Sequence, residues 1–456
     1  MGGTRKSRVP ILTALLPVRV GCKKADAQIS RPDLSRAIND HRRQGLQSLH
    51  NQHEVRSQMS SLPILVLNSG SSSIKFAMYE ATDGQRTKIF EGAVDGIATD
   101  NGKFWIKDSA GIKLTDETPD LPTRSVAFKL VAQSVLSGKF PAPKAIGHRT
   151  VSGSPTVLEN QLITPELIDD LDKYADLAPL HTPIAVYIMR EALKLFPGIP
   201  NFAVLDTYFH RTMPEIAKRM PISDEYADMG VRRYGYHGIS YESIIYQLQP
   251  NVPEKLIVAH LGNGASISAI RNGQCLDTSM GLTPSGGIIS ASRTGDIDPG
   301  VVIFILKQIA KSEPDTLKAA DKLETVISKK SGLVGMSGVS NDMRDLREAI
   351  KSGNEHAHLA VAKFTSTIAK WIGTFYAELN GLDMLVFTGG IGENDIASRA
   401  EICAGLEALG ITIDPARNHV RGAATISADS SRVTVRVIPP AEDLMIVNHV
   451  LRLLSD

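Results

Sequence analysis

Three turns rich in glycine and serine give the first sign of chemistry in this 456-residue sequence. Each turn follows a short apolar run, in segments 64–73, 256–266 and 384–394. Such a turn exposes backbone N–H groups with no side chain in the way, so it forms a concave site that suits phosphate oxygens. One turn alone is typical of a hairpin or loop. Three in one chain favour a nucleotide, because its phosphates and its adenosine need separate binding segments.

Seven short motifs carry a family resemblance, and they occur in order between residues 63 and 456. They are NSGSSSIK (68–75), GHR (147–149), LDT (205–207), YGYHG (234–238), HLGNG (260–264), RTGDIDP (293–299) and GIGEN (390–394). The P-loop pattern GxxxxGK[ST] is absent, which argues against a P-loop NTPase. In these motifs the sequence resembles the acetate kinase (acetokinase) family.

The resemblance implies an α/β fold with two duplicated ribonuclease-H-like lobes around an ATP cleft, as in the superfamily of acetate and sugar kinases, heat-shock ATPases and actin. The first lobe is then residues 59–207 plus 444–456, and the second is 208–443. The implied reaction is the reversible, Mg²⁺-dependent, direct in-line transfer of a phosphoryl group from ATP to acetate, which gives acetyl phosphate. The family acts as a homodimer, and Mn²⁺ is an expected substitute for Mg²⁺.

The same resemblance assigns roles to individual residues. ATP is expected to contact Lys75, His260, Leu261, Gly262, Asn263, Gly264, Asp342, Met343, Arg344, Gly390, Ile391, Gly392, Glu393 and Asn394. The carboxylate substrate is expected to contact Arg149 and an acyl pocket made of Val151, Leu180, Tyr236 and Pro284. The implied catalytic residues are Asp206, His181, His237 and Arg293, and the implied metal positions are Asn68 and Glu442.

The chemistry of these side chains agrees with the assigned roles. A planar guanidinium grips a carboxylate or a phosphoryl group through two N–H donors, which suits Arg149 and Arg293. His181 precedes an expected helix start, where unpaired N–H groups favour an anion. His237 lies between glycines and can approach an anion closely. Because a carboxylate nucleophile is already ionised at pH 7, no general base is needed, and Asp206 is expected to orient Mg²⁺ or an arginine.

Each of these residues also has an ordinary structural explanation when taken alone. A single histidine such as His181 or His237 is usually a hydrogen-bonded structural residue. Asp206 could form a strand-end turn, Arg293 could make a loop salt bridge, and Glu442 could be an acidic residue at a helix N-terminus. Only the order of the residues within the recognised motifs favours the functional interpretation.

Several residues depart from the common family pattern around the acyl pocket. Ser152 replaces a usual histidine, Thr182 a usual asparagine and Tyr236 a usual phenylalanine, and the segment 285–292 is a variant. One methylene group changes discrimination in such a pocket by about 1–3 kcal/mol. The sequence is therefore compatible with a propionate or butyrate kinase as well as with an acetate kinase. A non-catalytic ATP-driven clamp of the actin or heat-shock type is the alternative from another class, although it has no use for Arg149, His237 and Arg293.

The elements that must position these residues follow from apolar spacing and helix signals. Thr164-Pro165, Thr182-Pro183 and Asp298-Pro299 each predict an N-cap residue followed by proline at the first helical position. Apolar residues at helical spacing predict a long helix over 357–379, ended by Gly381. The run 384–387 then predicts a buried strand entering the third glycine turn. Strands alternate with helices throughout, which indicates an α/β fold.

Charge separates the first sixty residues from the rest. They carry eleven Lys or Arg against four Asp or Glu, a charge of +7, which leaves −6 on residues 61–456 of a chain with net charge +1. An acidic body gives no support to nucleic-acid binding. Segment 1–58 is interpreted as a disordered extension or as sequence upstream of a start at Met59. A transit peptide stays open, and prolines in the apolar stretch disfavour a secretory signal.

The cysteines and the apolar runs indicate in which cellular compartment the protein is expected. Cys22, Cys275 and Cys403 show no CxxC spacing, so neither a disulfide framework nor a structural zinc site is predicted. The longest apolar runs fall far short of the roughly 20 residues that span a bilayer. A cytoplasmic enzyme without a membrane or nucleic-acid partner is the expectation.

Overall fold

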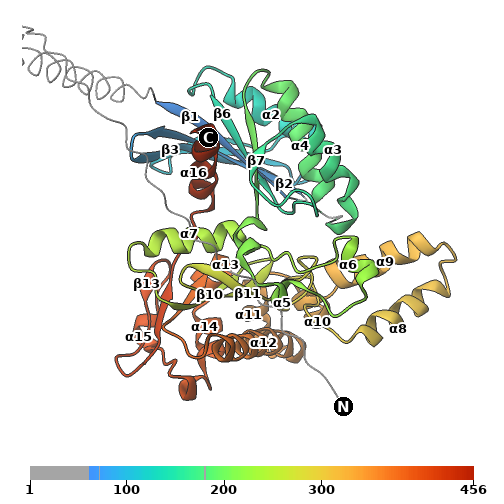
Figure 1. Cartoon of the computed structure of the whole chain (residues 1–456), viewed down its shortest axis with the longest axis vertical. Coiled ribbons are helices and arrows are strands. Elements are labelled where there is room, and N and C mark those ends of the chain that lie inside the picture. Colours follow the sequence, from blue (N-terminus) through green and yellow to red (C-terminus); the bar gives the residue numbers. More distant parts are fainter. Residues whose placement is uncertain (1–60, 71, 179–180, 456) are drawn as a thin grey trace, which may run out of the picture. The chain divides into compact units, whose positions relative to one another are not determined.

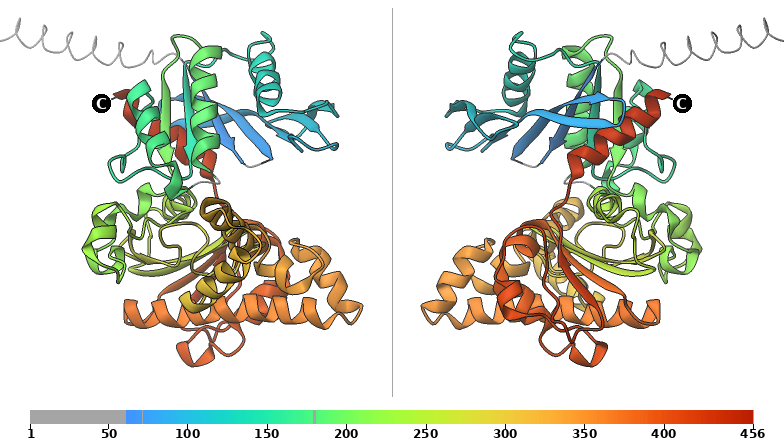
Figure 2. Two further views of the ribbon diagram at one scale, coloured as in Figure 1. Left: turned by 90° about the vertical axis from the view of Figure 1, so that its right-hand side faces the viewer. Right: turned by 90° about the vertical axis from the view of Figure 1, so that its left-hand side faces the viewer.

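The computed structural model describes residues 61–70, 72–178 and 181–455. The N-terminal extension predicted for residues 1–58 and the pocket residue Leu180 lie outside these ranges. The strands of the described part form two sheets, which are shown with their helices in Figures 1 and 2.

The first sheet has the strand order β5-β4-β3-β2-β1-β6-β8-β7. Its strands are β1 (Leu62–Ser69), β2 (Ser73–Thr82), β3 (Gln85–Asp95), β4 (Lys103–Asp108), β5 (Lys113–Glu117), β6 (Ala145–Thr150), β7 (Gln161–Leu162) and β8 (Asn201–Leu205). The second sheet has the order β11-β10-β9-β12-β14-β13. Its strands are β9 (Lys255–Leu261), β10 (Ala265–Arg271), β11 (Gln274–Thr278), β12 (Met384–Thr388), β13 (Ala424–Thr425) and β14 (Thr434–Val437).

The helices fall between these strands and after them. They are α2 (Arg124–Val135), α3 (Pro165–Lys173), α4 (Thr182–Leu195), α5 (Glu215–Lys218), α6 (Asp224–Asp228), α7 (Gly238–Leu248), α8 (Pro299–Ala310), α9 (Thr316–Lys329), α10 (Gly332–Ser337), α11 (Met343–Lys351), α12 (Glu355–Leu379), α13 (Gly389–Asn394), α14 (Ile396–Cys403), α15 (Pro415–Asn418) and α16 (Glu442–Ser455). No helix in the described part is both long and apolar enough to cross a membrane.

Both sheets follow one connection plan. In the first, β1 pairs antiparallel with β2 and parallel with β6, and β6 pairs parallel with β8. In the second, β9 pairs antiparallel with β10 and parallel with β12, and β12 pairs parallel with β14. Each sheet thus joins an antiparallel meander, β1–β5 in the first and β9–β11 in the second, to parallel crossover strands. This repetition confirms the predicted α/β fold with duplicated lobes.

The two faces of the first sheet bury different side chains because successive residues of a strand point to opposite faces. Leu65 and Leu67 of β1 pack with α2 and α4, whereas Ile64 and Val66 pack with α16. At Gly147 of β6 a β-carbon would lie 2.5 Å from Ile446 of α16, so only glycine lets this helix come so close. Helix α16 therefore covers one face of the sheet that contains β1 and β6.

The second sheet is covered in the same alternating way. Ile257 and Ala259 of β9 pack with α12, whose buried stripe includes Phe364, Ile368, Ile372 and Phe375. Leu256 and Val258 face the other way and pack with α7. Helix α12, with 25 residues the longest helix of the described part, runs beneath this sheet in Figure 2. Because helices pack on both faces of each sheet, the carboxyl ends of its strands are held in fixed positions. Residues at those ends can form a site.

The predicted helix signals are confirmed in part. Thr164 caps α3 by accepting a hydrogen bond from the N–H of Leu167, and Asp298 caps α8 through the N–H of Gly300. The prediction that Thr182 caps α4 is wrong, because the helix already begins at Thr182 and His181 is the N-cap residue. Helix α7 begins at Gly238, and His237 is its N-cap residue. Each of these helices therefore has a predicted catalytic histidine directly at its N-terminus.

Candidate active site

The carboxyl ends of three parallel strands bring together predicted residues of the first sheet. In the strand register Asn68 of β1 pairs with Arg149 of β6, and Thr150 pairs with Leu205 of β8, which Asp206 follows. Asp206 also donates its backbone N–H to the carbonyl of Thr150 over 2.9 Å. Ligands of open α/β sheets bind outside the carboxyl ends of the strands. Asn68, Arg149 and Asp206 occupy that position.

Arg149 is the centre of the polar contacts at this edge. Its Nε donates to Oδ1 and Oδ2 of Asp206 over 3.2 and 3.1 Å, and its Nη2 donates to Oδ2 over 2.5 Å. Its Nη1 donates to Oδ1 of Asn68 over 3.3 Å. A guanidinium has five N–H groups, so these contacts leave one N–H on Nη1 and one on Nη2. Those two can grip an incoming carboxylate.

The electrostatics of this edge follow from burial and from the ion pair. Burial lowers the pKa of Arg149, but Asp206 and Glu442 outweigh it and raise that pKa above its usual range. Burial raises the pKa of Asp206, and the Arg149 guanidinium opposes that rise. Glu442 begins α16, and its charge acts on both groups. A second carboxylate thus lies near the pair.

Lys75 and Asn68 are direct neighbours across β1 and β2. Lys75 lies in strand β2, which begins at Ser73, so it follows the predicted phosphate loop rather than forming part of it. Its side chain is exposed. The antiparallel register of β1 and β2 therefore places Lys75 opposite Asn68.

In the second sheet, two of the glycine turns lie at the carboxyl ends of adjacent parallel strands. His260 of β9 is in register with Thr388 of β12. The turn 262–264 follows His260, and α13, which contains Gly390, Ile391, Gly392, Glu393 and Asn394, follows Thr388. A β-carbon at Gly389 would lie 2.8 Å from the carbonyl oxygen of Leu261, so the two turns touch there. The third glycine turn is thus the start of a short helix.

His237 has a strained backbone. Its φ of 57° and ψ of 24° lie in the left-handed region, which non-glycine residues rarely adopt and which clusters at functional sites. The N–H of Gly238 donates to the carbonyl of Asp206 over 2.8 Å and holds this turn. The ring of His237 stacks on the ring of His260, with centroids 4.2 Å apart. The predicted catalytic histidine therefore lies against the predicted phosphate loop.

Gly264 marks the point where His237 and Arg293 meet. A β-carbon there would lie 3.2 Å from Nε2 of His237 and 3.2 Å from Nη1 of Arg293. The turn and the Arg293 loop are also joined directly, because Ala291 donates its N–H to the carbonyl of Asn263 over 3.2 Å. Without a side chain at Gly264, two nitrogen groups face one small space, where they can contact an anion.

A cavity of about 530 Å³ opens beside these turns. Its lining joins the predicted ATP residues of three segments: Gly262, Asn263, Asp342, Met343, Arg344, Gly390, Ile391 and Asn394. Asn341, Arg347, Asp395 and Arg421 line it as well and were not predicted. Its volume falls within the range of about 300–1,000 Å³ that is typical of small-molecule sites.

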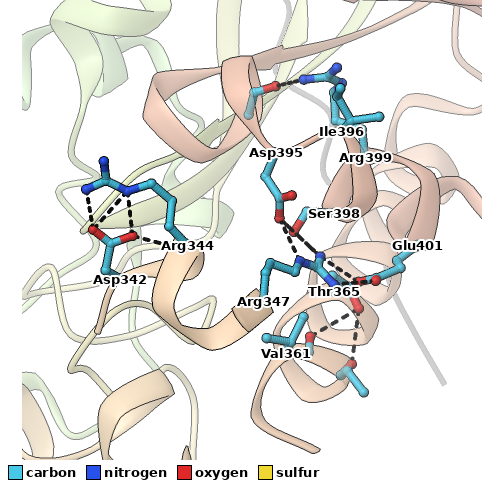
Figure 3. A network of polar contacts seen from close by, with 12 residues as sticks. Asp342, Arg344, Arg347, Val361, Thr365, Asp395, Ile396, Ser398, Arg399 and Glu401 are labelled. Carbon is cyan, nitrogen blue, oxygen red and sulfur yellow. Dashed lines mark hydrogen bonds and ion pairs between the residues drawn. The ribbon is translucent and has the colours of Figure 1, made fainter. Parts of the chain in front are cut away.

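The polar contacts around this cavity are shown in Figure 3. Asp342 caps α11 and pairs with Arg344, whose Nη2 lies 2.5 Å from Oδ2 of Asp342. Arg347 donates to Asp395 over 3.1 Å and to Glu401 over 2.6 Å, which ties α11 to the N-cap residue and the last turn of α14. These ion pairs fix the positions of the segments on two sides of the cavity.

Arg399 supports α13 through hydrogen bonds to its carbonyl groups. It is the largest fully buried side chain in the described part, and its five N–H groups all have acceptors. Nη1 donates to the carbonyls of Gly392 and Glu393 over 2.9 Å each. Nε and Nη2 donate to Asn418 and Val420 over 2.8 Å each. Arg399 thus satisfies carbonyls at the end of α13, which no sequence signal predicted.

A smaller cavity of about 70 Å³ joins further predicted residues. His181, Pro284 and Arg293 line it together. Arg293 also donates through Nη1 to the carbonyl of Pro284 over 3.2 Å. Tyr236 is buried and donates its hydroxyl to the carbonyl of Leu282 over 2.5 Å. The cavity is therefore bounded by residues predicted for the acyl pocket and for phosphoryl transfer.

The pocket residues Val151 and Tyr236 are connected through Ser152. Burial raises the pKa of Tyr236, and a hydrogen bond with Ser152 opposes that rise. Ser152 is buried and directly follows Val151, which is half-buried. The serine in place of the family's usual histidine therefore has a polar partner in the substituted tyrosine.

The histidines at the site are neutral at pH 7. Burial, together with the charges of Arg293 and Arg149, lowers the pKa of His181 to about 4. Burial and Arg149 also lower the pKa of His260 to about 4. Burial, His260 and the two arginines hold the pKa of His237 well below its ordinary value. The positive charge at the site therefore comes from the arginines, and the histidines are uncharged.

Comparison with known proteins shows the family to which this chain belongs. The sequence profile of the Acetokinase family matches residues 63–448. The acetate kinase of Phocaeicola vulgatus is 40% identical over 407 residues, which cover 86% of this chain and 100% of that protein. The structure of Porphyromonas gingivalis acetate kinase aligns with a TM-score of 0.75 at 36% identity, and that of a Francisella tularensis propionate kinase with 0.78 at 34% identity. Each alignment covers 86% of this chain and 100% of the other chain.

Proposed function

Since the chain belongs to the acetokinase family, we propose that it transfers the terminal phosphoryl group of ATP to acetate and forms acetyl phosphate reversibly. The observation that carries the proposal is that Arg149 keeps two N–H groups without an acceptor in the described part of the structure. Its contacts with Asp206 and Asn68 leave one N–H on each of two terminal nitrogens, which fit a small carboxylate. A water-activating ATPase has no need for such a group.

The proposed transfer follows from the positions of the two arginines. Arg149 holds acetate, whose ionised oxygen is the nucleophile and needs no general base. Arg293 and His237 face the space at Gly264, where they contact the phosphoryl group during its transfer. In phosphoryl transfer the protein chiefly positions the reactants and stabilises charge on the equatorial oxygens. His181, at the N-terminus of α4, lines the smaller cavity together with Arg293 and is proposed to act beside it.

The residues that we propose for the nucleotide are those around the larger cavity. Adenosine lies against α11 and α13, and the phosphates follow the turn 262–264 toward Arg293. Residues Lys75, His260, Leu261 and Gly264 border the phosphates, and Gly392 and Glu393 belong to the adenosine side through α13. In support, the cavity joins three of the predicted ATP segments.

Mg²⁺ is the proposed cofactor, with Mn²⁺ as a substitute, and Asn68 and Glu442 are its proposed protein ligands. Their oxygen donors suit a hard cation. The residues fit, because Mg²⁺ is usually held by one or two carboxylates together with substrate phosphates. When bound, the ion would neutralise charge on the phosphates. Among the described residues no group of three His, Cys, Asp or Glu side chains is placed to hold a metal by itself.

The test of function is ATP-dependent formation of acyl phosphate, trapped by hydroxylamine, with formate, acetate, propionate and butyrate. We expect acetate to give the highest kcat/KM or one close to that of propionate, and we expect no activity without a divalent cation. Activity confined to butyrate would reject acetate as the substrate and retain a carboxylate kinase. ATP hydrolysis that no carboxylic acid changes would favour an ATP-driven clamp.

A homodimer is the proposed assembly, and α8 is its proposed contact. None of the twelve residues of α8 is buried, although most of them are apolar. Ile303 is 54% exposed and Phe304 is 63% exposed. A helix that is apolar all round needs a partner to cover it, and the family resemblance implies a second copy of this chain.

Sedimentation of a Phe304→Glu variant tests this contact. We expect monomers, whereas Ile216→Glu, which changes a residue that is 91% exposed elsewhere, should stay dimeric. A Phe304→Glu variant that remains a dimer would reject α8 as the contact. The lobe boundaries at 207/208 and 443/444 and the cytoplasmic location stay predictions. In support of the boundaries, the first sheet draws its strands from 62–205 and the second from 255–437.

A further inference from the structure

Each of the two stacked histidines has a buried serine hydroxyl at Nδ1. Oγ of Ser266 lies 2.8 Å from Nδ1 of His237, and Oγ of Ser240 lies 2.8 Å from Nδ1 of His260. Both serines are fully buried. The other ring nitrogens face the substrate side: Nε2 of His237 points to the space at Gly264, and Nε2 of His260 to Gly262. Neither serine was predicted as a site residue.

A neutral imidazole carries one N–H, and the hydrogen bond at one nitrogen decides whether the other nitrogen is a donor. If Nδ1 accepted a hydrogen bond, Nε2 would carry the proton and could donate to a phosphate oxygen. If Nδ1 donated, Nε2 would present a lone pair and repel the same oxygen. The direction of the bond from serine therefore decides whether His237 helps or hinders the phosphoryl group.

At His237 a third side chain, Tyr241, shares the hydroxyl of Ser266. Its hydroxyl lies 2.5 Å from Oγ of Ser266, and the tyrosine is fully buried. A phenol is a stronger acid than an aliphatic hydroxyl, so the tyrosine is the better donor of the two. When Tyr241 donates to Oγ, the single proton of Ser266 remains for Nδ1 of His237. The three side chains then form a chain of hydrogen bonds with one direction.

We propose that Ser266, oriented by Tyr241, fixes His237 as the neutral imidazole that carries its proton on Nε2. Ser240 does the same for His260, because its buried hydroxyl has no other hydrogen-bond partner among the described residues and needs Nδ1 as its acceptor. The three hydroxyl residues are positioning residues, because they act on the phosphates only through the histidines. This inference rests on the proposed phosphoryl transfer for its role in catalysis. The tautomer itself is a property of the free protein.

Nitrogen NMR of the full chain labelled with ¹⁵N-histidine tests the tautomer without substrate. Signals of His237 and His260 are assigned by their loss in His237→Gln and His260→Gln. We expect both rings to be protonated at Nε2 in the wild-type protein at pH 7.5. Protonation of His237 at Nδ1 would overturn the proposal, whatever the enzyme's activity. Because no substrate is present, failure of the proposed function leaves this measurement unaffected.

Kinetics of Ser266→Ala test the consequence. Loss of a partner that orients a histidine ligand typically costs 10–100-fold in activity at metal sites, and we expect a fall in kcat of about that size with KM for ATP and acetate little changed. Tyr241→Phe should lower kcat less, because Ser266 keeps its proton. Ser240→Ala should raise the KM for ATP more than it lowers kcat.

The matched control is Ser268→Ala. Ser268 lies two residues after Ser266 on the same face of β10, is also fully buried, and donates to the carbonyl of Asp277 instead of facing a histidine. We expect this variant to keep a normal kcat and the Nε2–H signals. Equal losses of kcat in Ser266→Ala and Ser268→Ala would show a merely structural role and overturn the proposal, as would a wild-type kcat in folded Ser266→Ala.

Discussion

Arg149 and Asp206 form a two-point ion pair, in which Nε donates over 3.2 and 3.1 Å and Nη2 donates over 2.5 Å to the carboxylate. Asp206 is 1% exposed, so its charge is compensated mainly by this guanidinium. The pair fixes the plane of Arg149 and therefore the direction of its remaining N–H groups. The carboxylate is thus placed to orient an arginine, which agrees with the expectation that it does not act as a base.

The first prediction concerns this pair. Asp206→Asn keeps the shape of the side chain but removes the charge that holds Arg149, so we expect KM for acetate to rise at least tenfold and KM for ATP to change little. Arg149→Ala should raise KM for acetate further and lower kcat, because a misplaced nucleophile spoils the in-line approach. Steady-state kinetics with each substrate varied checks this. A normal KM for acetate in folded Arg149→Ala would contradict the assignment.

Substitution of Arg293 should affect the kinetics differently from substitution of Arg149, since Arg293 contacts the phosphoryl group most strongly in the transition state. An arginine in that role is worth about 10³–10⁵ in kcat, so Arg293→Ala should lower kcat steeply with little change in KM for ATP. Arg293→Lys should recover part of the rate, because lysine keeps the charge but lacks the planar fork. Arg190→Ala, which removes a surface ion pair on α4, is the control. Near-normal turnover of Arg293→Ala would favour a structural salt-bridge role.

The third prediction concerns Arg399, which supports the nucleotide site but is not proposed to contact the nucleotide. Arg399→Met removes the donors to Gly392 and Glu393, so α13 should loosen. Hydrogen bonds from a charged group contribute about 1.5–3 kcal/mol each, and we expect Tm to fall by roughly 5 °C or more and KM for ATP to rise. Arg417→Met changes a half-exposed arginine paired with Asp429 and should leave both values nearly unchanged. An unaltered Tm in Arg399→Met would contradict this support role.

Buried neutral histidines predict loss of stability in acid. Burial lowers the pKa values of His148, His181, His210 and His260 to about 4, from about 6.5 in the unfolded chain. Between these pH values the unfolded state binds more protons than the native state, so stability rises with pH. The urea midpoint should therefore fall as pH drops from 6.5 toward 4 and stay level from 7 to 8. A midpoint that is equal or higher at pH 5 than at pH 7.5 would refute it.

The sequence by itself determined the family, the α/β fold and the chemical identity of the site residues. Glycine-rich turns and paired arginines are local features, readable because glycine and arginine are chosen for backbone approach and for planar donors. Thr164 and Asp298 were recognised as helix caps for the same reason, since a cap contacts residues only two or three positions away.

Only the tertiary structure decided how these residues combine. Asn68, Arg149 and Asp206 are separated by dozens of residues, and the parallel register of β1, β6 and β8 brings them together. Ser266, Tyr241 and Arg399 carry no local signal, because a buried hydroxyl or guanidinium takes its partner from whatever the fold packs against it. The direction of a hydrogen bond at His237 and the support beneath α13 depend on such packing, which sequence spacing does not encode.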